Sequence, residues 1–220
     1  RAAQALADLP AGRLRPADRA ALARALREAR AANEANAERP EAQVALGLQA
    51  LRYGDAASAR EAYEKALARA PFFVPARVNL ADLARSEGNE REAIEQLRSA
   101  LEYVPEDGLV RYALGLALHR AGEPEVALRE LEQASESAPL DSRITLGYAL
   151  ALDGQDRRSE TLNVLGSAID EGRGDGALYQ ALISFLREEG RMDEALARAE
   201  SWLTAYPDDP QARAVLGLGE

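Results

Sequence analysis

The sequence is informative first through what it lacks. It has no cysteine, and only one histidine, one methionine and one tryptophan among its 220 residues. Without cysteine it has no disulfide, zinc ribbon, thioether-linked haem or thiol nucleophile. The single histidine, His119, has no carboxylate and nucleophile at the spacing of a catalytic triad and no partner for a metal site. We therefore expect a protein that is not an enzyme and uses no metal or cofactor.

Positive charge and long apolar runs are also scarce. Lysine and arginine number 27 against 37 acidic residues, for a formal charge of −10. Nucleic-acid binding needs a basic face, so we expect no nucleic-acid partner. No apolar stretch approaches the roughly 20 residues that cross a bilayer, so we expect no membrane span. We expect a soluble bacterial protein, and the sequence leaves open whether its compartment is the cytoplasm or the periplasm.

What is present is a repeat. Prolines at positions 71, 105 and 139 are evenly spaced, and Pro207 follows two such steps later. Glycines recur in the same frame, and the fourth repeat has Asp156 at the equivalent position, with Gly154 nearby. The recurring glycines are Gly54, Gly88, Gly122 and Gly190. The sequence is therefore built from a 34-residue repeating unit.

Within each unit, apolar residues recur every three or four positions, which is typical of amphipathic helices of about 12–15 residues. The glycine falls between two such helices, where the chain needs a left-handed conformation. The proline follows the second helix, which it cannot continue. One such hairpin cannot bury its apolar face alone, whereas a stack of hairpins can.

These spacings resemble the tetratricopeptide repeat, whose 34-residue helix–turn–helix unit has Leu-Gly, Ala, an aromatic residue and Pro at set positions. The resemblance implies an all-α, right-handed α-solenoid of five repeats with helical caps. The repeats are expected at residues 40–73, 74–107, 108–141, 142–175 and 176–209.

The ends of the chain are less regular. We expect residues 1–39 to form an N-terminal helical cap or the end of an upstream helical domain, with a short helix at 1–9 and a long Ala/Arg-rich helix at 17–37. Residues 210–220 are expected to form a C-terminal capping helix. The order of these segments also resembles the C-terminal part of large bacterial proteins that carry multihaem cytochrome domains upstream. This chain has no Cys-x-x-Cys-His motif.

The resemblance implies that the first helix of each repeat lines a concave groove. Polar and aromatic residues collect at recognition surfaces, and repeats two and three have most of them on the groove side. The alternative is a solvated groove whose charges pair among themselves. The predicted groove residues are Asn79, Asp82, Arg85, Tyr112, Leu116, His119 and Arg120.

Some members of the family hold the terminal carboxylate of a chaperone with paired basic and asparagine residues. Only Asn79 and Arg143 match that clamp here, and the other clamp positions hold Glu41, Ala45, Leu109, Ala113 and Gly147. A chaperone-tail function is therefore disfavoured. The main hypothesis is a non-enzymatic scaffold that binds a protein or peptide partner in the groove. The alternative is a structural module of a larger, multihaem cytochrome-like protein, docking against an upstream domain of the same chain.

Overall fold

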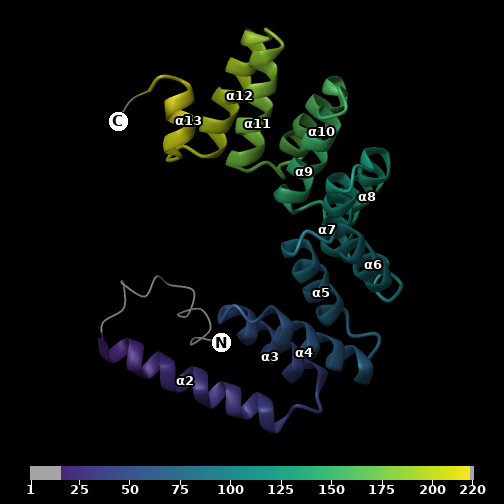
Figure 1. Ribbon diagram of the computed structural model, residues 1–220. Coiled ribbons are helices and arrows are strands. Elements are labelled where there is room, and N and C mark those ends of the chain that lie inside the picture. The colour runs from purple at the N-terminus through teal and green to yellow at the C-terminus, as the bar shows by residue number, and fades with distance from the viewer. Residues whose placement is uncertain (1–15, 219–220) are drawn as a thin grey trace. The chain divides into compact units, whose positions relative to one another are not determined.

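The computed structural model describes residues 16–218 (Figure 1). Every regular element in this range is a helix, and no helix within it is long and apolar enough to span a bilayer. The fold is the expected all-α arrangement of stacked helix–turn–helix repeats. The helix expected at residues 1–9 lies outside the described range.

Two compact units make up the chain, residues 1–103 and 104–220. The first contains α2 (Pro16–Ala35), α3 (Pro40–Arg52), α4 (Ala56–Arg69), α5 (Val74–Ser86) and α6 (Glu90–Leu101). The second contains α7 (Gly108–Arg120), α8 (Pro124–Ser137), α9 (Ser142–Asp153), α10 (Arg158–Asp170), α11 (Gly176–Glu188), α12 (Met192–Ala205) and α13 (Pro210–Val215).

The turns inside the hairpins follow from backbone sterics. Four equivalent glycines have φ between +72° and +79°, a region that side chains disfavour. In the fourth repeat Asp156 takes this place with φ +58°, as the sole non-glycine residue of positive φ in the described range. Aspartate is among the few residues that tolerate this conformation. The turn geometry is therefore kept where the glycine is absent.

Aspartates start the first helices of the second unit. Asp107, Asp141, Asp175 and Asp209 occupy the same place in successive repeats, and each side chain accepts hydrogen bonds from backbone N–H groups two or three positions later. Such caps satisfy donors that a helix end leaves open and place a negative charge at the positive end of the helix dipole. The first unit uses Pro40 and Pro75 in the first turns of α3 and α5 instead.

Each unit has its own core. In the first unit the wholly buried Tyr63 packs with Val44, Leu80 and Leu83, and its ring lies against Gly47. In the second unit Trp202 is wholly buried and stacks on Tyr179, with ring centroids 5.8 Å apart. Large rings fit because small residues stand opposite them on the neighbouring helices.

Candidate functional site

The first helices of the second unit lie side by side. α7 contacts α9, and α9 contacts α11, whereas no comparable contact joins α8 to α10 or α10 to α12 in the described part of the chain. Because the first helices approach one another more closely than the second helices do, this unit is concave on the first-helix side. We call the exposed side of α7, α9 and α11 the first-helix face.

The 34-residue frame arranges this face in rows. Residues one repeat apart occupy equivalent places on neighbouring helices, so that each row crosses α7, α9 and α11 in turn. The rows are Leu109, Arg143 and Ala177; Tyr112, Leu146 and Gln180; Leu116, Leu150 and Ser184; and His119, Asp153 and Arg187.

The middle of the first-helix face is apolar. Tyr112 and Leu116 are half-buried and pack against the cluster around Leu131 and Leu152. The Tyr112 ring lies on Gly147 of α9, where a β-carbon would come within 2.5 Å of the ring. Burial raises the pKa of Tyr112 above its ordinary value, so its phenol keeps its proton and can donate a hydrogen bond. Leu150 is 52% exposed.

Charged residues border this apolar middle. Arg143 bonds to Asp141 at 2.6 Å and holds the pKa of that carboxyl below its usual range. Asp153 is bound by Arg158 at 2.7 Å, and Arg158 also binds Glu188 at 2.8 Å. Neither the His119 side chain nor the Arg187 side chain has a hydrogen bond or an ion pair within residues 16–218. The carboxylate of Asp153 is thus engaged, and the guanidinium of Arg187 is open to a ligand.

A hollow of about 420 Å³ adjoins Arg187 at the end of this face. Ile183 and Ser184 of α11, Met192 of α12 and Val215 of α13 line it, together with the polar side chains of Gln180, Arg187 and Glu188. Met192 is 57% exposed and Val215 is 41% exposed. The hollow therefore offers an apolar surface next to an unpaired cation.

The three predicted groove residues of the first unit lie on α5 and are engaged there. The Asn79 amide donates to the carbonyl oxygen of Pro75, one turn earlier, at 2.6 Å. Asp82 and Arg85 form an ion pair at 3.6 Å, with both side chains at least half exposed. These contacts agree with the alternative of charges that pair among themselves.

The predicted groove residues thus fall into two groups on two helices. Asn79, Asp82 and Arg85 share α5, and the others share α7: Tyr112, Leu116, His119 and Arg120. His119 and Arg120 are at the end of α7, where Arg120 is exposed. Because α5 and α7 belong to different units, each group forms a separate candidate surface, and binding at either remains a prediction.

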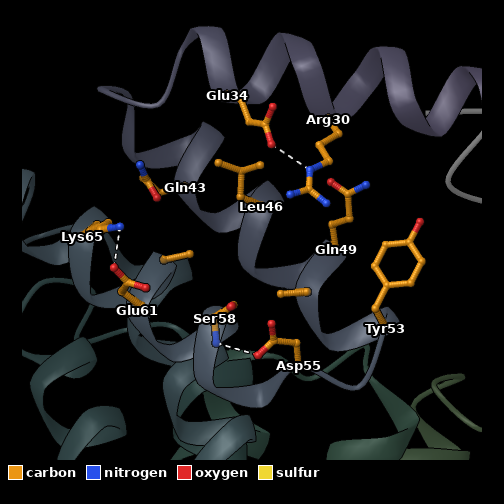
Figure 2. A pocket seen from close by; sticks show the side chains of 12 residues that line it. Arg30, Glu34, Gln43, Leu46, Gln49, Tyr53, Asp55, Ser58, Glu61 and Lys65 are labelled. Atoms are coloured by element: carbon orange, nitrogen blue, oxygen red, sulfur yellow. Dashed lines mark hydrogen bonds and ion pairs between the residues drawn. The ribbon is translucent and has the colours of Figure 1, made fainter.

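The first unit has a hollow of about 460 Å³ between α2, α3 and α4 (Figure 2). Its charged residues pair within single helices, Arg30 with Glu34 and Lys65 with Glu61, at 2.7 Å each. Asp55 caps α4 by accepting from the Ser58 N–H at 2.9 Å. This hollow depends on how α2 packs on α3, which the repeat pattern of the sequence does not specify. Its polar groups are largely engaged by one another.

Among residues 16–218, no three His, Cys, Asp or Glu side chains lie together as a set of metal ligands. Exposed ion pairs within or between neighbouring helices account for many of the acidic side chains, as with Glu160, Glu194 and Asp170.

Comparison with known families agrees with the repeat pattern. One tetratricopeptide repeat model matches residues 50–114 and again residues 84–151, and a second matches residues 176–219. Together the matches span about two thirds of the chain. A search of curated protein sequences finds no match.

Solved structures share the fold. MamA superposes with a TM-score of 0.63 at 20% identity, covering 80% of this chain and 93% of that one. PilF of Pseudomonas aeruginosa gives 0.62 at 20% identity and covers 80% of both chains. YrrB, described as a TPR protein with an unusual peptide-binding site, gives 0.58 at 20% identity, covering 85% of this chain and 96% of that one. From the repeat spacing, the stacked hairpins and the family matches, we conclude that the chain belongs to the tetratricopeptide repeat family.

Proposed function

We propose that this protein is a non-enzymatic scaffold that holds a segment of a partner protein against the exposed side of its first helices. The family and its fold support a role in protein–protein interaction. One observation supports a binding site on this side of the second unit. The first helices of the second unit lie side by side and expose Leu109 and Leu150 among polar side chains.

Exposed leucines on a concave surface favour a binding role. Leu109 is 54% exposed and Leu150 is 52% exposed, and the half-buried Tyr112, Leu116 and Leu146 adjoin them. Covering apolar surface yields about 25 cal/mol per Å² removed from water, so a segment that covers two leucines gains several kcal/mol before its ordering cost. The Tyr112 phenol adds a hydrogen-bond donor at the centre of the face.

The α5 group contributes differently. Asn79 supplies an amide that can bond both the N–H and the C=O of a bound backbone, after it leaves the Pro75 carbonyl. Asp82 and Arg85 are exposed and pair only weakly, so a ligand can displace one partner from the other at little cost. The comparisons do not favour the alternative of docking against an upstream haem-carrying domain.

A selection with displayed peptides tests this proposal. A random library of peptides of about 16 residues, long enough to cross several repeats, is selected on the full chain. Synthetic copies of the enriched peptides are then added to isotope-labelled protein, and the backbone amide signals are followed by NMR. We expect the shifted signals to concentrate on α5 or on α7, α9 and α11.

Variants at the predicted residues sharpen this test. Asn79→Ala should weaken peptides that map to α5, and Tyr112→Ala should weaken those that map to α7, by about tenfold for a central contact. The spectra of each variant without peptide serve as the folding control. An enrichment that yields no peptide, or peptides that shift only α4, α6, α8, α10 and α12, would refute the proposed function.

A further inference from the structure

Charge is segregated between the two layers of helices in the second unit. The first helices α7, α9 and α11 carry four arginines against two carboxylates. The second helices α8, α10 and α12 carry three arginines against nine carboxylates. In a chain of formal charge −10, the helices α7, α9 and α11 themselves thus carry a net positive charge, with an aspartate capping the N-terminal end of each.

The contacts on the first-helix face strengthen this separation. Arg158, from a second helix, binds both carboxylates of the first helices, Asp153 at 2.7 Å and Glu188 at 2.8 Å. The same guanidinium lies over the Phe185 ring, 4.4 Å from its centroid, which holds it in place. The two carboxylates thus share the single positive charge of Arg158, while the Arg187 side chain has no carboxylate partner in the described residues.

Arg143 is the second cation of the first-helix face, and its side chain is largely exposed to solvent. The Arg143 side chain is 76% exposed although it bonds to Asp141. Arg143 stands near the start of α9 and Arg187 near the end of α11. Because these helices are equivalent parts of successive repeats, the ten-residue offset places the two cations about 15 Å apart along the helix direction. A single terminal carboxylate cannot reach both.

Between the two cations lies the apolar part of the face. Leu146 and Leu150 of α9 stand there, and the hollow lined by Ile183, Met192 and Val215 adjoins Arg187. A ligand that fits must therefore present apolar side chains between carboxylates that are separated along its length.

We propose that the first-helix face of the second unit binds an acidic segment of another protein, with leucine-like side chains set between aspartates or glutamates. This inference rests on the proposed function and specifies its partner. Arg143 and Arg187 meet separate carboxylates of the segment. Leu150 and the hollow beside Arg187 take its apolar side chains.

The net charge of the whole chain does not outweigh the local charge. At physiological salt the Debye length is about 8 Å, so a carboxylate bound at Arg187 interacts mainly with charges of the same face. The acidic second helices then act in favour of the proposal, because they repel the same segment and direct it to the other side. Electrostatic complementarity of this kind selects the partner, and apolar contact supplies much of the affinity.

The displayed-peptide selection on the full chain, at about 0.15 M salt, provides the probes for the test. We expect the peptides that map to α7, α9 and α11 to be enriched in Asp and Glu flanking Leu, Ile, Phe or Met. Their affinity, measured by fluorescence anisotropy, should fall about tenfold in Arg187→Glu and about tenfold in Leu150→Ser. Amidation of the peptide C-terminus should leave the affinity unchanged.

The matched control is Arg129→Glu. Arg129 is an exposed arginine of α8 whose side chain has no hydrogen bond or ion pair in residues 16–218, so this variant changes the net charge equally on the opposite layer. We expect it to leave peptide affinity within about twofold. Circular dichroism of each variant confirms that the helices are retained.

The results separate this inference from the proposed function. Peptides that shift α7, α9 and α11 but lack acidic residues, or that bind Arg187→Glu and wild type equally, overturn the acidic partner and leave the scaffold role standing. An equal loss in Arg129→Glu overturns the assignment to this face. Self-association of the chain through α7, α9 and α11, detected by sedimentation and abolished by Leu150→Ser, would replace the proposed partner with a second copy.

Discussion

Single residues decide how closely the helices approach. In each unit an aromatic ring lies on a glycine of a neighbouring helix, Tyr63 on Gly47 in the first unit and Tyr112 on Gly147 in the second. A β-carbon at either glycine would overlap the ring. The rings therefore occupy space that only glycine leaves open. An interior packed this tightly has no room for an added methyl group.

Gly147→Ala tests this contact. The new β-carbon would lie 2.5 Å from Tyr112 Cε2 and 2.7 Å from its hydroxyl oxygen, so the ring must move out. We expect the free energy of unfolding in urea to fall by about 1–3 kcal/mol, and Tyr112→Ala in the same chain to recover part of it. Gly154→Ala is the control, because its β-carbon meets backbone oxygens no nearer than 3.5 Å and its φ of −63° suits alanine. Equal losses in the two single variants would contradict this account.

Tyr63→Phe tests a buried hydroxyl. Tyr63 is wholly buried, and its hydroxyl has no hydrogen-bond partner among the described residues. Burial, and to a lesser extent the charge of Asp82, raises the pKa of Tyr63 to about 12 from 10. The folded state therefore holds this proton more tightly, so the free energy of unfolding falls as the pH rises from about 10 to about 12.

We expect Tyr63→Phe to be as stable as wild type at pH 7, within about 1 kcal/mol, because it removes an unsatisfied group without making a large cavity. It should also lessen the loss of stability between pH 10 and 12, as measured by urea unfolding across that range. Some loss remains in the variant, since burial also raises the pKa of Tyr148 to about 12. An unchanged pH dependence would show that Tyr63 does not contribute to it.

At the level of helices, arginines bind the segment that leads into their own hairpin. Arg77 of α5 and Arg111 of α7 occupy equivalent places in successive repeats, and each guanidinium donates to the carbonyl of the proline before its own helix, Pro71 or Pro105. Arg111 also binds Glu130 of α8 at 2.8 Å, where the two side chains are only 16% and 22% exposed. Arg111 thus links the segment just before α7 to the second helix of the same hairpin.

Arg111→Met should break both links while keeping the apolar stem. Glu130 would then lose its partner in a largely buried place, and we expect unfolding in urea to require about 1–3 kcal/mol less. Arg91→Met is the comparison, because the Arg91 side chain is 91% exposed in its pair with Glu95, and it should cost less than about 0.5 kcal/mol. Arg111→Met combined with Glu130→Leu should recover most of the loss. A cost for Arg111→Met as small as that for Arg91→Met would exclude a structural role for the link.

At the level of the whole molecule, each of the two units has a core of its own. In the second unit a large cluster surrounds Trp202, Tyr179 and Leu182 and is built from residues between positions 146 and 216. Repeat proteins gain stability from neighbouring hairpins, so a unit that retains all its internal neighbours can fold separately. Trp202 is the single tryptophan of the chain and thus reports on this unit alone.

We expect residues 104–220, expressed alone, to fold. The fragment should show helical circular dichroism, a single cooperative urea transition, and the blue-shifted emission of a buried tryptophan. In the full chain the tryptophan signal should follow the second unit, while circular dichroism follows both units. A fragment with the emission of exposed tryptophan and no cooperative transition would show that the second unit depends on the first.

The sequence by itself determined the helix pairs, their turns and the family. Glycine, proline and the three-to-four-residue apolar spacing act through local backbone sterics and helix geometry, so they can be interpreted without the fold. The conformation of Asp156 is also set locally. Its position in the repeat is that of the turn glycine, and its φ of +58° lies in the left-handed region. The aspartates that cap α7, α9, α11 and α13 also recur at 34-residue spacing in the sequence.

Only the tertiary structure decided which side chains of the first helices are available. Asn79 is engaged by the Pro75 carbonyl, Asp82 and Arg85 pair with each other, and Asp153 is taken by Arg158 from the next helix. Arg187 is left with an open guanidinium beside an apolar hollow. Helix periodicity gives the face on which a residue lies. The partners of that residue are side chains that packing brings together, many of them from other helices. The sequence pattern does not specify those pairings.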